Sequence, residues 1–412
     1  MYYRESDLES FQASTFHVAR ASRSPIGRSA KLKHLSSAAP RPRCSHHLWM
    51  ATTSQPRCLA STDDTFNGAV SNRKQRTDHV TLNNFREAQF SNDGTTVITQ
   101  SEDQCLRTFI LPEDLLETSS DAKQLSAYNV VKSPTNIQAY AVYPNFSLSD
   151  VATTVALYSA RDLPVRLVKL LYQDHVQATY PLIYPQTEAY IAPSSIAWTR
   201  DGAHFITGSM NLLSCFDSSV SGAGPIIQHR TVPSRSEKRQ EVTPRTRTCV
   251  GQISALSINC DGVLAAGTLR GEVALYSNEG AGECTTAFSV DSANSDEKQI
   301  SGDGVTQLAW SPCGTYLSVA ERHSDVLQVF DTRNTHRRVS YLSGRKALTS
   351  QKLGVDVVPS RHGHELWAGG TDGCVRMWEN PGRTSGEHLP DRVMESHQGQ
   401  SCHYLLSGAR QY

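Results

Sequence analysis

The hydrophobic pattern of residues 85–110 predicts a group of short antiparallel strands. Residues 88–90 lead into Ser91-Asn92-Asp93-Gly94, Thr95–Thr99 is a β-branched run, and the polar residues 101–103 precede Leu106–Phe109. Clusters of Ser, Asn, Asp and Gly between β-branched or apolar runs mark turns, and Asp-Gly is a strong hairpin signal. This unit is therefore expected to fold as strand, turn, strand, turn, strand.

The same pattern returns along the chain. Further copies lie at Ile196–Phe216, Leu256–Tyr276, Leu308–Asp331 and Glu365–Trp378. The interval from the apolar residue before the first turn to the closing aromatic residue is 19, 18, 18 and 20 residues in the first four copies. The closing aromatic residues are Phe109, Phe216, Tyr276, Phe330 and Trp378. Because the gap of 107 residues between the first two is long enough for two units, a further copy is expected at Ile137–Leu167, with strands at Thr153–Tyr158 and Val165–Val168.

These repeats predict an all-β fold, a WD-repeat β-propeller. A spacing of roughly 54 residues exceeds the 40–45 of a WD-type blade because loops are inserted. A unit of three or four short strands cannot bury both of its faces alone, so the units must close radially. Six blades are recognisable, and an incomplete or composite last blade would make seven. Trp198, Trp310, Trp367 and Trp378 are then expected to pack between blades, which we favour over a role in ligand binding.

Composition and charge narrow the class of protein. The 412 residues are 38% hydrophobic, and 40 basic residues balance 40 acidic ones. A neutral chain binds nucleic acid or a membrane surface only through local patches. Since no run approaches 18 apolar residues, a membrane-spanning helix is not expected. The ten cysteines form no CxxC motif, which favours reduced thiols in the cytosol or nucleus over a disulfide scaffold or zinc site.

The two ends differ from the repeats. No acidic residue lies between Glu9 and Asp63, where arginine and lysine alternate with Ser, Ala and Pro. Such a segment resembles a mitochondrial transit peptide in composition, but a disordered basic tail is favoured. We expect a tail over residues 1–77, the propeller over 78–396 and an irregular tail over 397–412. The last blade is either truncated or completed by a strand near Asp78–Leu82.

Searches for catalytic chemistry find no candidate. The chain lacks GxxxxGK[ST], GxSxG, HExxH and a GxGxxG motif after a strand. His362-Gly363-His364 has no third ligand nearby in the sequence, and a surface turn is favoured over a metal site. The sequence therefore predicts a protein that is not an enzyme, with no catalytic residue, metal or cofactor and no small-molecule substrate.

Basic loops are the remaining signal. Residues 229–247 carry a net charge of +4 in a loop between two repeats. Lys and Arg in such a loop can contact phosphates, although a solvated linker has the same composition. Arg337, Arg338, Arg345 and Lys346 form a second basic segment. The candidate RNA-binding residues, taken from the first loop and from two turns, are Arg230, Arg235, Lys238, Arg239, Arg245, Arg247, Arg270 and Arg322.

Four further features accompany the repeats: Gln104–Pro112, the long connection Tyr172–Ala197 before Trp198–Gly202, Gly267–Tyr276 and Glu321–Asp331. With these features on the repeat frame, residues 80–380 resemble the telomerase Cajal body protein family. Typical WD repeats pair an Asp before the last inner strand with a His from an incoming Gly-His. In this chain only Asp103 and Asp372 occupy that position well, and no incoming Gly-His is evident.

The resemblance implies a non-catalytic scaffold that binds small nuclear or Cajal-body RNA, including telomerase RNA in some lineages, together with ribonucleoprotein proteins. It also implies a nuclear location, in Cajal bodies or nucleoplasm, and roles in particle biogenesis or splicing. Single-stranded RNA loops suit such recognition, since bases stack on Arg or aromatic side chains. The alternative is a WD-repeat adaptor that joins proteins. Either would be a monomeric propeller with no membrane partner.

Overall fold

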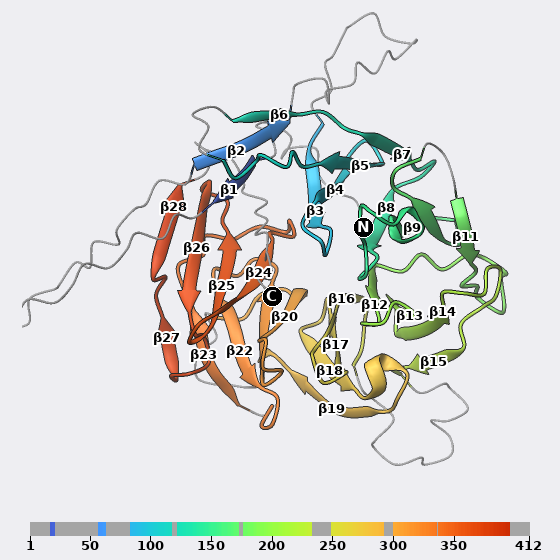
Figure 1. The fold of residues 1–412 in the computed structure, drawn as a ribbon. Helices are drawn as coiled ribbons and strands as arrows, with labels where there is room; N and C mark the ends of the chain where they lie inside the picture. The colour runs from blue at the N-terminus through green and yellow to red at the C-terminus, as the bar shows by residue number, and fades with distance from the viewer. Residues whose placement is uncertain are drawn as a thin grey trace, which may run out of the picture.

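Six antiparallel sheets stand around a common axis in the computed structural model, which confirms the predicted propeller (Figure 1). The structure describes residues 17–20, 57–62, 83–117, 122–172, 176–232, 249–291, 300–335 and 337–395. In each blade we letter the four strands a to d in chain order; a lies nearest the axis and d outermost (Figure 1).

The blades follow one another along the chain. The first comprises β3 (Phe85–Phe90), β4 (Thr96–Ser101), β5 (Cys105–Ile110) and β7 (Asn129–Lys132). The second comprises β8 (Ile137–Val142), β9 (Val155–Ala160), β10 (Val165–Lys169) and β11 (Val176–Tyr180). The third comprises β12 (Ser195–Trp198), β13 (His204–Ser209), β14 (Leu212–Asp217) and β15 (Ile227–Arg230).

The fourth blade comprises β16 (Ile253–Ile258), β17 (Leu264–Thr268), β18 (Glu272–Tyr276) and β19 (Cys284–Ser289). The fifth comprises β20 (Val305–Trp310), β21 (Tyr316–Glu321), β22 (Leu327–Asp331) and β23 (Arg338–Leu342), with β27 (Gly386–His388) added at its outer edge. The sixth comprises β24 (Val355–Ser360), β25 (Gly363–Gly369), β26 (Cys374–Glu379) and β28 (Arg392–Glu395). The copy predicted at 137–167 is thus the second blade, and every closing aromatic residue lies on strand c.

The turns between strands a and b explain why the repeats begin alike. In the first blade the Ser91 hydroxyl accepts from Thr96 N at 3.0 Å, and in the third the Thr199 hydroxyl accepts from His204 N at 3.0 Å. Gly94 and Gly202 follow with φ near +70°. Glycine takes this backbone conformation at no steric cost, so the turn needs a short polar residue first and a glycine last.

A three-stranded sheet lies between the sixth and first blades (Figure 1). It pairs β1 (His17–Arg20) with β2 (Arg57–Thr62) and β2 with β6 (Lys123–Leu125). Leu59, Ala60 and Leu125 pack in one apolar cluster with Phe85 and Phe109 of the first blade.

Residues 57–62 were expected in the disordered tail, and they form a strand because their apolar side chains cover the first blade. Residues 17–20 were expected in the same tail and form strand β1 beside β2. The other residues of the expected tails, residues 397–412 included, and the segment 78–82 lie outside the described residues. The domain boundaries therefore remain predictions.

Three of the four tryptophans, Trp198, Trp310 and Trp378, pack between blades as predicted. The Trp198 indole of the third blade donates to Ala141 O of the second at 3.2 Å, and the Trp310 indole of the fifth donates to Ser257 O of the fourth at 3.0 Å. Trp378 is 1% exposed among apolar side chains of the fifth and sixth blades, whereas the buried Trp367 packs with side chains of its own sixth blade. A buried indole N–H is stabilised by an acceptor, so the hydrogen bonds of Trp198 and Trp310 each set the position of one blade against the next.

Asp103 and Asp372 hold their turns through arginine and not histidine. Asp372 accepts from Arg376 Nη1 at 3.0 Å, and Asp103 accepts from Arg107 Nη1 at 3.0 Å. Both arginine side chains are nearly buried, at 8% and 11% exposure. An arginine fork matches a carboxylate in two places, so the pair replaces the missing Gly-His contact.

The helices of the described residues include the 3₁₀ turns η3 (Val151–Thr153) and η6 (Asn278–Gly280). In the part of the chain that the structure covers, no helix has the length and apolar character needed to cross a bilayer.

Candidate functional site

The three described RNA-binding candidates lie on one face of the propeller. We call it the b–c face, because it carries the turns between strands b and c and the connections between blades. Arg270 and Arg322 stand in the b–c turns of the fourth and fifth blades, and Arg230 ends strand d of the third. Arg230 and Arg270 are exposed, and Arg322 is half-buried. The other five candidates, in residues 233–248, lie outside the described residues.

Two of these arginines are held by their surroundings. The Arg322 guanidinium donates from Nη2 to Asp303 O at 2.7 Å, and His323 Nδ1 lies 2.7 Å from Asp303 Oδ2. The aliphatic part of Arg270 lies against Gly251, whose φ is +113°. These contacts place Arg270 and Arg322 beside the connections that enter their blades.

The charge of the b–c face is mixed in the described residues. Exposed Lys132, Arg161, Lys346 and Lys352 join the arginine candidates. Exposed acidic side chains on the same turns and connections are Glu102, Asp103, Asp162, Glu188, Asp291, Asp303, Asp372 and Glu395. Positive and negative groups therefore alternate here, and an excess of positive charge would have to come from residues 233–248.

Only part of the second basic segment, Arg337, Arg338, Arg345 and Lys346, lies on the surface. Arg345 is 2% exposed; its Nε donates to Gly369 O at 3.2 Å and its Nη2 to Leu353 O at 2.8 Å. Burial lowers the pKa of Arg345 to about 10. Arg338 is 8% exposed and donates to Gln328 Oε1 at 3.0 Å. Both had been expected in a basic surface loop, and this expectation is wrong because backbone and side-chain acceptors draw them inside.

Exposed aromatic side chains on the b–c face were not identified from the sequence. The connection between β11 and β12 folds back on itself, with a bridge between Ile183 and Tyr190 and a hydrogen bond from Tyr184 N to Ala189 O at 3.0 Å. Tyr184 is 44% exposed and Tyr190 40%, and Met210 in the neighbouring b–c turn is 52% exposed. In the sequence, the signal for these exposed rings is the presence of two tyrosines, Tyr184 and Tyr190, in the segment around Pro185. Exposed aromatic rings can stack with nucleic-acid bases or dock a protein side chain.

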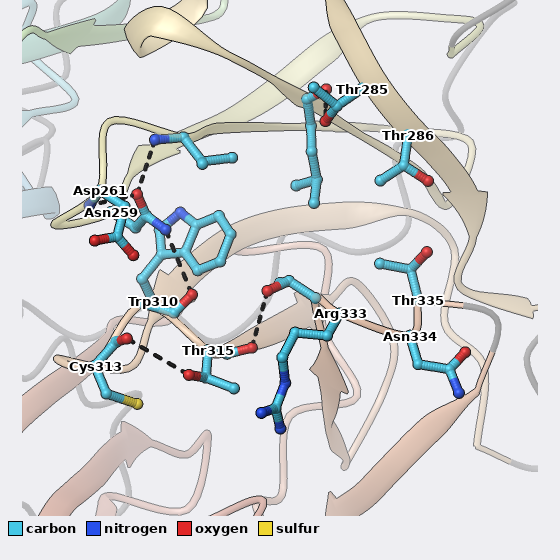
Figure 2. Close-up of a pocket in the computed structure, with 14 residues that line it drawn as sticks. Asn259, Asp261, Thr285, Thr286, Trp310, Cys313, Thr315, Arg333, Asn334 and Thr335 are labelled. Carbon is cyan, nitrogen blue, oxygen red and sulfur yellow. Dashed lines mark hydrogen bonds between the residues drawn. The ribbon is translucent and has the colours of Figure 1, made fainter.

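A pocket of about 600 Å³ opens on the opposite face, between the fourth and fifth blades (Figure 2). We call this the a–b face, because it carries the turns between strands a and b and the connections between c and d. The buried side chains of Leu275 and Trp310 line the pocket. Figure 2 shows the Trp310 ring between the Asn259–Asp261 turn on one side and Thr285, Thr286 and Thr335 on the other. An apolar floor with a polar rim is typical of a binding pocket.

The histidine pair of the sequence does not form a metal site with other described residues. His364 is 6% exposed, and burial lowers its pKa, whereas His362 is exposed. In the ranges that the structure covers, no three His, Cys, Asp or Glu side chains gather as metal ligands. The described residues thus present exposed charged and aromatic surfaces on the b–c face and a pocket on the a–b face.

The fold and these surfaces define a WD-repeat type of propeller scaffold. No protein-family model matches the chain. Comparison with curated proteins finds remote relatives at 23–28% identity, which relates the chain to WD-repeat proteins only loosely.

Three of these relatives span most of this chain. Guanine nucleotide-binding protein negative regulator 1 of Schizosaccharomyces pombe is 28% identical over 311 residues, 75% of this chain and 73% of its own length. Protein SWT21 of Kluyveromyces lactis is 26% identical over 306 residues, 70% of this chain and 67% of its own. Telomerase Cajal body protein 1 of Mesocricetus auratus is 23% identical over 306 residues, 73% of this chain and 51% of its own.

Proposed function

We propose that this protein is a non-catalytic RNA-binding scaffold of small nuclear or Cajal-body ribonucleoproteins, located in the nucleus. RNA would bind on the b–c face. The observation that carries the proposal is that Arg230, Arg270 and Arg322 share this face with the exposed rings of Tyr184 and Tyr190. Single-stranded RNA is held by basic groups on its phosphates and by aromatic or arginine planes on its bases. The similarity to a telomerase Cajal body protein supports the same choice of ligand.

The first test is crosslinking and sequencing of RNA bound to the tagged protein in cells. We expect small nuclear or Cajal-body RNA with the wild type, and loss of that RNA with Arg245→Glu plus Arg247→Glu. Arg230→Glu plus Arg270→Glu is expected to reduce recovery on the described part of the face. Arg361→Glu makes the same charge change in an exposed a–b turn and should leave recovery unchanged.

The salt dependence of affinity separates phosphate contacts from nonspecific effects. Each lost contact to single-stranded RNA reduces the slope of log K against log salt by about 0.7. The Arg245→Glu plus Arg247→Glu protein should therefore have a slope shallower by about 1.4 in a fluorescence titration with the recovered RNA. RNA recovery that survives both pairs of changes would refute this placement of the site. Recovery at background from the wild type would refute the function.

The alternative is a WD-repeat adaptor that joins proteins without RNA. The mixed charge of the described b–c face favours it, since an adaptor needs no basic stripe. The exposed Tyr184, Tyr190 and Met210 also suit a protein partner. Absence of RNA from the crosslinked wild-type protein, with partner proteins still bound, would establish this function in place of the first.

A further inference from the structure

Neighbouring blades are joined on their outside by short stretches of chain. Beside the fifth blade, β27 from the c–d connection of the sixth pairs parallel with β23, matching Ser340–Leu342 with Gly386–His388. Beside β2, β6 from the c–d connection of the first blade pairs in the same parallel manner. In both places an extended segment covers the outer edge of the preceding sheet.

Other joints are closed by hydrogen bonds between the same connection and the outer strand of the preceding blade. Asn129 Nδ2 of the first blade donates to Tyr172 O of the second at 2.8 Å. Gly222 N of the third donates to Thr179 O of the second at 2.7 Å. His229 Nε2 of the third lies 3.1 Å from Gly280 O of the fourth. The c–d connection thus contacts the outer strand of the preceding blade at each of these joints.

The joint between the fourth and fifth blades is different. In the described residues β19 is the last strand of its sheet, and the pocket lies between Thr285 and Thr286 of β19 and Thr332–Thr335 of the fifth blade's connection. An uncovered strand edge presents backbone donors and acceptors that a further strand can use.

The sequence explains why this joint is open. In the joint between the second and third blades, Tyr143 packs on Trp198 at 5.1 Å between ring centres, and Phe205 on Trp198 at 5.7 Å. The matching tryptophan at the joint between the fourth and fifth blades is Trp310. Each of the two indoles donates to the carbonyl of the penultimate residue of strand a in the preceding blade, Ala141 of β8 for Trp198 and Ser257 of β16 for Trp310.

Asn259 directly follows β16 as Tyr143 follows β8, and Leu317 pairs with Phe330 as Phe205 pairs with Phe216. An amide and a leucine thus stand where two aromatic rings fill the other joint. The smaller side chains leave space beside Trp310.

The mouth of the pocket carries a charge that can select a ligand. Asp261 is exposed on the rim and forms no salt bridge with another residue in the part of the chain that the structure describes. The charge of Arg200 acts on Asp261, but the Arg200 guanidinium forms its salt bridge with Glu279. Across the mouth, Arg333 is already paired with Asp331, at 2.7 Å from Nη2 to Oδ2. The rim therefore complements a basic group next to Asp261 more than an acidic group next to Arg333.

We propose that this pocket docks an extended peptide of a partner protein, with one large apolar side chain beside Trp310 and Leu275 and a neighbouring Lys or Arg at Asp261. The peptide backbone runs along the β19 edge, in the position that β27 takes beside β23. This is strand addition with a side-chain pocket, in which the edge provides affinity and the pocket provides specificity. The site lies on the a–b face, opposite the proposed RNA face, so the docking does not depend on RNA binding.

Selection of displayed random twelve-residue peptides for binding to the purified full-length protein tests the docking site. We expect enriched sequences to share a large apolar residue near a Lys or Arg, and one such peptide to bind in a fluorescence anisotropy titration. Thr286→Trp fills the pocket and should raise the Kd at least tenfold. Leu116→Trp adds the same ring on a side chain that is 61% exposed in the c–d connection of the first blade, away from both β19 and the pocket, and should change the Kd less than twofold.

A second variant keeps the test informative if Thr286→Trp disturbs folding. The Asp261→Asn change removes the charge at nearly constant shape, and should raise the Kd about fivefold at low salt and hardly at all at high salt. A peptide that binds both variants as it binds the wild type, or no enriched peptide, would overturn the proposal. RNA recovered with Thr286→Trp should equal the wild-type amount, which separates this site from the RNA-binding function.

Discussion

Replacing Trp198 with alanine should destabilise the propeller by about 3–5 kcal/mol, the range for removal of a large buried aromatic side chain. The ring contacts Tyr143 and Phe205 at 5.1 and 5.7 Å, and its indole donates to Ala141 O at 3.2 Å. Alanine removes all three contacts and leaves a cavity between the second and third blades. Two of these partners, Tyr143 and Ala141, belong to the second blade, so the change weakens the contact between the second and third blades and not only the sheet of the third.

Thermal unfolding followed by circular dichroism measures this effect. At about 2–3 °C per kcal/mol, Trp198→Ala should lower the Tm by roughly 6–15 °C. Trp198→Phe retains most of the packing but loses the indole donor, and should cost about 1–2 kcal/mol. Tyr128→Ala, at a side chain 60% exposed, should change stability by less than about 0.5 kcal/mol. Equal Tm values for Trp198→Ala and Tyr128→Ala would contradict a structural role for the Trp198 joint.

The repeat pattern predicted the blades because each needs the same local signals. Ser91 and Thr199 cap their turns, and Gly94 and Gly202 complete them, so short-range chemistry is enough to recognise strands a and b. The closing aromatic residues lie on strand c for a related reason, since c is buried between two blades. The degenerate second blade was found by spacing alone, because its a–b connection, residues 143–154, has no Asp-Gly turn.

Features that depend on distant parts of the chain were not predicted. Arg345 is buried because the carbonyls of Gly369 and Leu353 accept its hydrogen bonds, and neither can be recognised as a partner in a local window. The pocket exists because Asn259 and Leu317 occupy positions that are aromatic at another joint. That comparison needs the strand register, which the structure provides.

The candidate RNA-binding residues also combine features that the local sequence shows with features that depend on distant parts of the chain. The propeller topology brings Arg230, Arg270 and Arg322 to one face from three separate segments. The sequence identifies these residues but not the face that they share. The acidic neighbours, above all Asp303 beside Arg322 and His323, come from a connection nineteen residues earlier in the chain than Arg322. A count of basic residues along one loop does not include these neighbours, so it does not give the net charge of this face.

Replacing Asp372 with alanine should destabilise the sixth blade by roughly 2–3 kcal/mol, below the 3–5 of a fully buried pair because the Asp372 side chain is 35% exposed. Arg376 would keep its hydrogen bond from Nη1 to Arg345 O at 3.1 Å but would lose both carboxylate contacts. The cost comes mainly from a nearly buried guanidinium without its counter-ion. The Asp372→Ala plus Arg376→Leu protein should therefore recover a large part of the lost stability.

The pH dependence of the stability lost in Asp372→Ala tests whether the charge of the Asp372–Arg376 pair causes that loss. Burial of the Asp372 carboxyl opposes its ionisation, but the hydrogen bonds and charge of Arg376 outweigh burial and hold its pKa below the ordinary 3.8. A carboxyl with a lower pKa in the folded protein stabilises the fold above the unfolded-state value, and this contribution is lost as the pH falls through the folded-state pKa. In urea unfolding, the difference between wild type and Asp372→Ala should be constant from pH 7 to about 5 and shrink below about pH 4. A difference that persists unchanged at pH 3 would mean that Asp372 acts through turn geometry and not through its charge.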